Sequence, residues 1–185
     1  MTIKFNIAEI CLCTEAEGPG RRLAIWFQGC NILCEGCCNI DMQPLIIKHL
    51  ISNEDLIEII KESAMKNHLE GVTLLGGEPT IQKGLAHLSH MIKELGMGVI
   101  LFTGRLVEEL PSDLLDAVDL VIDGHYDEFR KDHIRNSIGS INQRMVHITG
   151  RYKDMEAWYR SSRPMHVEIN NDNQNLIFTG DVFYK

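Results

Sequence analysis

The sequence predicts an α/β fold in which outer helices cover a parallel sheet. Short apolar runs typical of buried strands alternate with amphipathic helical segments, and glycine-containing turns follow the runs. This alternation favours parallel strands joined by right-handed crossovers. Because ligands of such sheets bind beyond the carboxyl ends of the strands, we expect the functional site among the glycine turns.

The first strand and helix are predicted on either side of a cysteine-rich loop. Residues 23–29, LAIWFQG, are apolar, favour a strand and end in a glycine. After the loop, Ser52 precedes acidic residues, which is typical of a helix N-cap. Leu56, Ile59 and Ile60 then follow at helical spacing, so the sequence predicts a helix from this cap onward.

Further strand and helix units follow in the middle of the chain. Residues 85–95 carry leucine and isoleucine at helical spacing, and a second helical stretch is predicted over residues 106–117. Pro111 is expected to start or divide that stretch. The strands predicted in this region are residues 71–75, 99–102 and 120–122.

The last third of the chain has weaker patterns. Residues 126–144 are polar and poorly periodic, so we interpret them as a long functional loop. Residues 167–169 and 176–178 are expected to pair as a hairpin. Because 185 residues suit one domain with a full core, residues 1–185 are expected to form a single domain.

Composition and charge exclude several classes of protein. Lys and Arg number 18 against 26 Asp and Glu, so the chain has no global basic field to hold nucleic acid. The N-terminal region lacks the continuous apolar core of a signal peptide. No window approaches the roughly 20 apolar residues of a membrane span. We therefore expect a cytoplasmic protein without nucleic-acid or membrane partners.

All six cysteines lie in the first 38 residues, which favours a metal or iron–sulfur site over a disulfide framework. Cys30, Cys34 and Cys37 form a C-x3-C-x2-C motif after the first predicted strand. Structural zinc sites and ferredoxin-type clusters use four protein ligands, and the adjacent Cys38 is a poor fourth ligand. Three thiolates therefore predict a four-iron cluster that leaves one iron for an exogenous ligand.

The cysteine motif resembles the signature of radical S-adenosylmethionine enzymes, and other segments extend the resemblance. Residues 17–22, EGPGRR, followed by residues 25–30, IWFQGC, are similar to a stretch of the glycyl-radical-enzyme activating enzymes. Residues 76–79, GGEP, follow a predicted strand as the same motif does in that family. Residues 139–144, GSINQR, are similar to a segment of the small anaerobic ribonucleotide reductase activating proteins.

The resemblance implies a fold, two cofactors and a set of site residues. The implied fold is a partial (βα) barrel, and the implied cofactors are a [4Fe-4S] cluster and S-adenosyl-L-methionine (SAM). The matched segments span about residues 15–148, which leaves residues 149–185 as an extension of unknown role. The cluster ligands implied are Cys30, Cys34 and Cys37. The implied cofactor-binding residues are Gly76, Gly77, Glu78, Pro79, Thr103 and Asp123.

The resemblance also implies an activity. A reduced cluster gives an electron to the sulfonium of SAM, and the broken carbon–sulfur bond yields methionine and a 5′-deoxyadenosyl radical. We expect this radical to generate a glycyl radical on a partner enzyme, with a reduced flavodoxin or ferredoxin as electron donor. Ile32 and Leu33 are expected to limit the access of water and oxygen to the cluster. No catalytic side chain is assigned.

Two other functions stay open. The first is a radical SAM enzyme that directly modifies a peptide or a small molecule, with residues 149–185 forming its substrate site. The second is a non-catalytic protein whose cysteines hold zinc or carry electrons. Product analysis separates the first from an activating enzyme, and metal content separates the second.

Several polar residues have two interpretations each. Glu78 contacts SAM or stabilises its own turn, and Asp123 binds a cofactor or a cation or else caps a turn. Arg21 and Arg22 contact a partner or a carboxylate, or they cover the sheet. The eight histidines show no metal-ligand spacing and are interpreted as structural or exposed.

The other three cysteines are also open. Cys38 stands where related activating proteins have an aromatic residue, and it is interpreted as a small hydrophobic replacement or as an extra redox-active thiol. Cys11 and Cys13 lie on one face if their segment is a strand, so they pair with each other or bind a ligand in that case.

Overall fold

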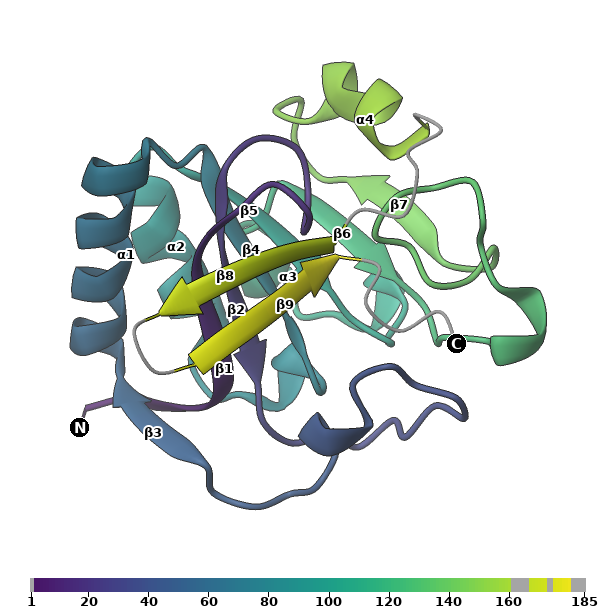
Figure 1. The fold of residues 1–185 in the computed structure, drawn as a ribbon, viewed down its shortest axis with the longest axis horizontal. Helices are drawn as coiled ribbons and strands as arrows, with labels where there is room; N and C mark the ends of the chain where they lie inside the picture. The colour runs from purple at the N-terminus through teal and green to yellow at the C-terminus, as the bar shows by residue number, and fades with distance from the viewer. Residues whose placement is uncertain (1, 161–166, 173–174, 181–185) are drawn as a thin grey trace.

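The computed structural model describes residues 2–160, 167–172 and 175–180, and in them a seven-stranded sheet with helices on one face (Figure 1). The strand order is β3-β1-β2-β4-β5-β6-β7, and β2, β4, β5 and β6 run parallel. Strands β1, β3 and β7 are antiparallel to their neighbours. The sheet strands are β1 (Lys4–Thr14), β2 (Arg22–Phe27), β3 (His49–Ser52), β4 (Gly71–Gly76), β5 (Gly98–Phe102), β6 (Leu120–Asp123) and β7 (Arg144–His147).

The helices lie between the parallel strands in the chain, as the crossover pattern predicts. They are α1 (Asn53–Asn67), α2 (Leu85–Glu94), α3 (Ser112–Leu115) and, later in the chain, α4 (Glu156–Arg160). The predicted cap of α1 is confirmed, because the Asp55 amide donates a hydrogen bond to Ser52 Oγ over 3.1 Å. None of these helices in the described residues has the length and apolar character needed to cross a bilayer.

The main hydrophobic core lies between the sheet and helices α1 and α2. Leu23, Ile25 and Phe27 of β2 are fully buried there, and Leu56 and Leu88 of the two helices pack in the same cluster. Every residue of β2 is buried, which is typical of a central strand covered on both faces. The predicted α/β fold with parallel central strands and outer helices is confirmed.

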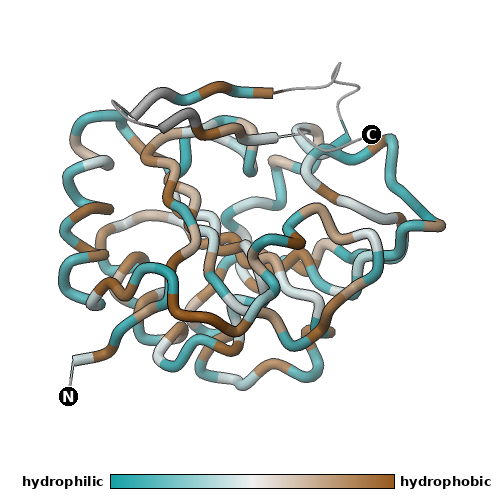
Figure 2. The backbone as a smooth tube through the Cα atoms, turned by 60° about the horizontal axis from the view of Figure 1, so that its bottom comes forward, coloured by the Kyte–Doolittle hydropathy of each residue, from teal (hydrophilic) through white to brown (hydrophobic). Residues whose placement is uncertain are grey.

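The opposite face of the sheet is covered by the last described part of the chain. Strands β8 (Val167–Asp172) and β9 (Asn175–Gly180) form an antiparallel hairpin, as predicted. The hairpin crosses in front of the sheet in Figure 1 and forms a separate layer at the top of Figure 2. Ile177 packs against Ala24, Trp26 and Leu75, so this face has a second, smaller core.

The predicted helix over residues 106–117 is wrong in its continuity. The chain forms a 3-10 turn at Val107–Glu109, then two extended residues, Leu110 and Pro111, and then the single turn of α3. Leu110 is extended (φ −81°, ψ 143°) because the following Pro111 disfavours helical geometry in the residue before it. Pro111 therefore divides the stretch, which was one of its two predicted roles.

A buried arginine joins the strands at their N-terminal ends. Arg22, the first residue of β2, is fully buried and donates to Thr73 Oγ1 over 2.7 Å and to the Val72 carbonyl over 2.9 Å. It also pairs with the Glu70 carboxylate and donates to the Tyr152 hydroxyl over 2.8 Å. Burial raises the pKa of Tyr152, so this hydroxyl stays protonated and donates to Glu70 over 2.8 Å.

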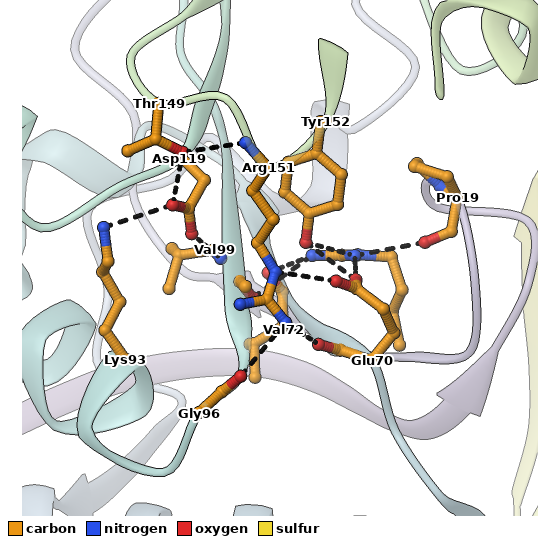
Figure 3. Close-up of polar contacts among 12 residues, drawn as sticks. Pro19, Glu70, Val72, Lys93, Gly96, Val99, Asp119, Thr149, Arg151 and Tyr152 are labelled. Atoms are coloured by element: carbon orange, nitrogen blue, oxygen red, sulfur yellow. Dashed lines mark hydrogen bonds and ion pairs between the residues drawn. The ribbon is translucent and has the colours of Figure 1, made fainter. Parts of the chain in front are cut away.

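Neighbouring residues extend this network along the N-terminal ends of the parallel strands (Figure 3). Arg151 donates to Glu70 over 2.9 Å and to the Gly96 carbonyl over 3.0 Å. The buried Asp119 accepts from the Val99 amide over 2.9 Å and from Thr149 Oγ1 over 2.8 Å. Hydrogen bonds thus hold residues 149–152 against the N-terminal ends of the parallel strands.

Candidate functional site

A cavity of about 710 Å³ opens at the C-terminal ends of the parallel strands. Its floor is formed by Trp26, Leu75 and Phe102 near the ends of β2, β4 and β5. Phe178 and Gly180 of the β8–β9 hairpin line another side. The predicted location of the site, among the glycine turns after the strands, agrees with this cavity.

The cysteine loop forms one wall of the cavity. The loop begins at Gly29, whose amide donates to the Met42 carbonyl over 2.8 Å, and the Cys30 amide donates to Gln43 over 2.9 Å. Leu33 and Gly36 adopt positive φ angles of 58° and 68°, which turn the chain between successive cysteines. As a result Cys30, Cys34 and Cys37 line the same cavity.

The three thiols differ in their surroundings. Burial raises the pKa of Cys34, although a hydrogen bond from the Tyr126 backbone opposes this. A hydrogen bond from the Cys38 thiol lowers the pKa of Cys37 to about 6, and the same contact raises the pKa of Cys38. Cys37 is therefore favoured as a thiolate, the form that binds metal.

The donor set of the cavity fits an iron–sulfur cluster. No three His, Cys, Asp or Glu side chains in the described ranges are close enough together to hold one metal ion. Three thiols instead line a cavity far larger than a single ion requires. Because iron–sulfur clusters bind cysteine thiolates, Cys30, Cys34 and Cys37 are the residues that would hold a cluster here.

The GGEP turn packs directly against the start of the cysteine loop. The Gly77 amide donates to the Phe27 carbonyl and the Glu78 amide donates to the Gly29 carbonyl, each over 2.9 Å. A methyl group on Gly77 would lie 2.2 Å from the Gly29 oxygen, and Gly76 has a φ of 116°. Only glycine permits this close approach of two backbones. Gly76 and Gly77 both line the cavity, as their predicted role requires.

The Glu78 carboxylate connects two strand-end turns. It is buried, with 1% of its surface exposed, and Oε1 accepts from Thr80 Oγ1 over 2.6 Å and from Thr103 Oγ1 over 2.8 Å. The other oxygen, Oε2, accepts from the Gly104 amide over 2.9 Å. These bonds correspond to the turn-stabilising interpretation of Glu78. Its binding to SAM stays a prediction.

Thr103 lines the cavity as predicted, and two other predicted residues do not. Pro79 is buried in a 3-10 turn behind the GGEP glycines and is not part of the cavity wall. Asp123 is fully buried, and its carboxylate accepts from the Arg144 guanidinium over 2.9 Å and from the Val107 amide over 2.8 Å. The next residue, Gly124, lines the cavity in its place. These bonds correspond to the turn-capping interpretation of Asp123, and its binding to a cofactor or a cation stays a prediction.

Two polar residues that sequence reasoning left unassigned bind the cysteine loop to its neighbours. Asn39 Nδ2 donates to the Gly76 carbonyl over 3.1 Å. Arg105 follows the Thr103-Gly104 turn and donates to Thr80 Oγ1 over 3.0 Å and to Asn31 Oδ1 over 3.2 Å. An arginine directly after a strand-end glycine turn was a signal that a search of strand ends would have found.

The predicted functional loop is confirmed as an irregular segment that lines the cavity. Between Gly124 and β7 it holds a 3-10 turn at Glu128–Arg130 and an isolated bridge of Lys131 with Ser140. Gln143, from the GSINQR segment, donates to the Gly124 carbonyl over 3.1 Å and accepts from the Gly139 amide over 3.0 Å. The cavity-lining residues of this loop are Tyr126, Glu128, Lys131, Ser137, Gly139 and Gln143.

Of the two residues expected to shield the cluster, Ile32 lines the cavity and Leu33 does not. Ile32 lines the cavity, and its side chain packs against Gly104. Leu33 is 60% exposed and is not among the residues that line the cavity. Leu33 therefore does not shield the site in this structure.

Cys11 and Cys13 lie on β1 and do not line the cavity, although Cys11 packs in the same cluster as Trp26 and Leu75, which do. Their segment is a strand, which was the condition for a disulfide between them, but both cysteines are free. Cys11 is 1% exposed and its thiol donates to the Cys13 carbonyl over 3.4 Å.

The two arginines after the EGPG turn differ in their contacts. Arg22 contacts the Glu70 carboxylate, whereas Arg21 is half-exposed and lies 3.5 Å from the Glu15 carboxylate.

Comparisons with known proteins agree with this site. A family model described as a 4Fe-4S single cluster domain matches residues 16–146, more than half of the chain. The anaerobic ribonucleoside-triphosphate reductase-activating protein of Enterobacteria phage T4 is 27% identical over 66% of this chain and 82% of its own length. The protein of the same name from Salmonella typhimurium is 26% identical over 71% of this chain and 92% of its own length.

Two more distant similarities complete the comparison. A putative glycyl-radical enzyme activating enzyme of Methanocaldococcus jannaschii is 25% identical over 72% of this chain and 51% of its own length. The structure of QueE from Escherichia coli matches with a TM-score of 0.47 and 20% identity, over 66% of this chain and 71% of that one. On the family match, the chain belongs to the 4Fe-4S single cluster domain family and is a radical SAM enzyme whose cofactors are a [4Fe-4S] cluster and SAM.

Proposed function

We propose that this protein is an activating enzyme that generates a glycyl radical on a partner enzyme. The observation that carries the proposal is the similarity to two anaerobic ribonucleoside-triphosphate reductase-activating proteins, which extends over 82% and 92% of their lengths. The family match over residues 16–146 includes the cysteine loop, the GGEP turn and the cavity-lining loop. A reduced flavodoxin or ferredoxin in the cytoplasm is the proposed electron donor.

In this proposal the two cofactors divide the cavity wall. Cys30, Cys34 and Cys37 hold the cluster, and SAM lies against Gly76, Gly77 and Thr103. The bound pair supplies a 5′-deoxyadenosyl radical. Glu78 acts as a positioning residue, because its carboxylate holds the turns after β4 and β5 together.

An exposed apolar stretch beside the cavity supports a protein substrate. Leu45, Ile46 and Ile47 are 74%, 58% and 74% exposed. The residues on either side of this stretch, Gln43 and Lys48, line the cavity. A partner loop that enters the cavity would cover these three side chains, and exposed apolar stretches commonly mark protein interaction sites.

The direct test is radical transfer to a partner. The reconstituted protein is reduced anaerobically with SAM and each co-encoded candidate enzyme, and the glycyl radical is measured by EPR together with released 5′-deoxyadenosine. We expect a glycyl signal on one candidate and none when its reacting glycine is replaced by alanine. Cleavage of SAM without a radical on any candidate would overturn the proposal.

A matched pair of variants tests the apolar stretch. Ile47→Ser removes an exposed apolar side chain beside the cavity, and Met65→Ser removes one of equal exposure, 74%, on α1. We expect Ile47→Ser to reduce radical transfer without changing SAM cleavage, and Met65→Ser to change neither. Equal transfer by both variants would remove the support that this stretch gives to a protein substrate.

The β8–β9 hairpin favours a second candidate, a radical SAM enzyme acting on a small molecule. The family match ends at residue 146, and the hairpin beyond it places Phe178 and Gly180 in the cavity wall. An added wall narrows a site that a partner loop would need open. In this alternative, incubation with cell metabolites yields a modified small molecule together with 5′-deoxyadenosine, and no protein radical.

A further inference from the structure

The cavity-lining loop brings a carboxylate against the link between two cluster cysteines. Gly36 lies between Cys34 and Cys37, and a methyl group on it would lie 2.3 Å from Glu128 Oε2 and 2.9 Å from Glu128 Cβ. Both the carboxylate and the stem of Glu128 therefore flank the Gly36 backbone. Glu128 lines the same cavity as the three cysteines.

The Glu128 carboxylate has no cationic partner among the described residues. The arginine of its own turn, Arg130, pairs instead with Asp127 over 2.7 Å. Lys131 also lines the cavity, but no ion pair joins it to Glu128 within the described ranges. The negative charge beside the cysteine link is thus not neutralised by a neighbouring side chain.

The backbone on both sides of Glu128 is held by hydrogen bonds. Asp127 caps the 3-10 turn by accepting from the Phe129 amide over 3.0 Å. The Asp127 amide donates to Ser140 Oγ over 3.1 Å, and Lys131 pairs with Ser140 as a β-bridge. The segment holding Glu128 is therefore anchored on both sides.

We propose that Glu128 sets the reduction potential of the cluster by placing a fixed negative charge beside its Cys34–Cys37 link. Reduction adds an electron to the cluster, and a nearby carboxylate raises the free energy of the reduced state more than that of the oxidised state. Glu128 thus makes the cluster harder to reduce and, once reduced, a stronger electron donor to SAM. This proposal rests on the cluster alone and holds whatever the substrate is.

Glu128→Gln tests the charge with little change of shape. The potential of the reconstituted cluster is measured by EPR-monitored redox titration without SAM, with iron content confirming equal loading. We expect the midpoint to become less negative, so that the ratio of reduced to oxidised cluster at the wild-type midpoint rises about fivefold. An unchanged or more negative midpoint would overturn the proposal.

Two controls separate charge from packing and from general surface charge. Glu128→Asp keeps the charge and is expected to retain a midpoint near that of the wild type. Glu35→Gln removes an exposed carboxylate from the same Cys34–Cys37 link, and Glu35 does not line the cavity. A smaller shift of the midpoint is expected, because water screens the Glu35 charge. A shift in either control as large as that of Glu128→Gln would contradict the proposal, as would loss of the cluster in Glu128→Gln alone.

Discussion

The two ends of the parallel strands are built on opposite principles. At the N-terminal ends, the buried Arg22 makes hydrogen bonds or ion pairs with Thr73, Glu70 and Tyr152, so its guanidinium is enclosed by partners. At the C-terminal ends, glycine turns and irregular loops surround a cavity that the thiols of Cys30, Cys34 and Cys37 line. Figure 3 shows how densely the first end is bonded.

The difference shows how one sheet separates stability from chemistry. A fully bonded polar network fixes the strands relative to one another at one end. The other end lines a cavity open to cofactors, and its shape depends on backbone contacts such as Gly77 to Phe27 and on the buried carboxylate of Glu78. Substitutions at the two ends should therefore affect different measurements.

The largest effect is expected for a cluster cysteine. Cys34→Ser removes one of three thiols that line the cavity, so we expect near-complete loss of iron and of the cluster EPR signal after reconstitution. The free energy of unfolding of the apo protein, measured with urea, should change little. Cys38→Ala is the matched control and is expected to retain its iron. If Cys38→Ala retained as little iron as Cys34→Ser, or less, the ligand assignment would be contradicted.

A smaller effect, on stability instead of iron, is expected at the other end. Arg22→Met leaves Glu70 without its buried partner, and we expect a loss of about 3 kcal/mol in the free energy of unfolding. Arg21→Met is the control, since that side chain is 52% exposed and its nearest carboxylate is 3.5 Å away. Its expected loss is under about 0.5 kcal/mol. Equal losses would break the distinction between the two arginines.

Gly77→Ala should affect both measurements, because this glycine lies where the site depends on backbone packing. Its methyl group would meet the Gly29 and Met42 carbonyl oxygens at 2.2 and 2.7 Å. We expect weaker SAM binding by calorimetry and a loss of about 2 kcal/mol in stability. Gly150→Ala serves as the control, because its added methyl group would have no atom within 4 Å. Undiminished SAM binding by Gly77→Ala would exclude the turn from the cofactor site.

The smallest effect concerns cysteine reactivity in the apo protein. Burial raises the pKa of Cys11 to about 12, whereas the pKa of Cys37 is lowered to about 6. At pH 8 iodoacetamide should therefore modify Cys37 rapidly and Cys11 only after unfolding, as followed by mass spectrometry. Rapid modification of Cys11 in the folded protein would show that β1 opens there.

Sequence patterns located the site because its parts are local. Glycines after apolar runs mark the carboxyl ends of parallel strands, so Cys30, Gly77 and Thr103 were expected at one edge of the sheet, and the structure places them around one cavity. Asp123 follows the same pattern, yet its carboxylate is bound by Arg144, 21 residues later in the chain. Direction of a side chain at a strand end depends on partners that the local pattern does not contain.

The other end of the sheet was not predicted, because its contacts are distant in sequence. Arg22 meets Glu70 and Tyr152 across 48 and 130 residues. The antiparallel strands β1 and β3 at one edge have apolar residues, but no hairpin turn joins them to mark their pairing. Neither feature leaves a short-range signal.

We expect the cavity at the strand ends to hold a cluster with an iron open to SAM. It is tested by anaerobic reconstitution with iron and sulfide, iron counting, and EPR of the dithionite-reduced protein with and without SAM. We predict four irons per chain and an EPR signal that changes when SAM is added. Bound zinc, or a cluster signal that SAM leaves unchanged, would contradict it.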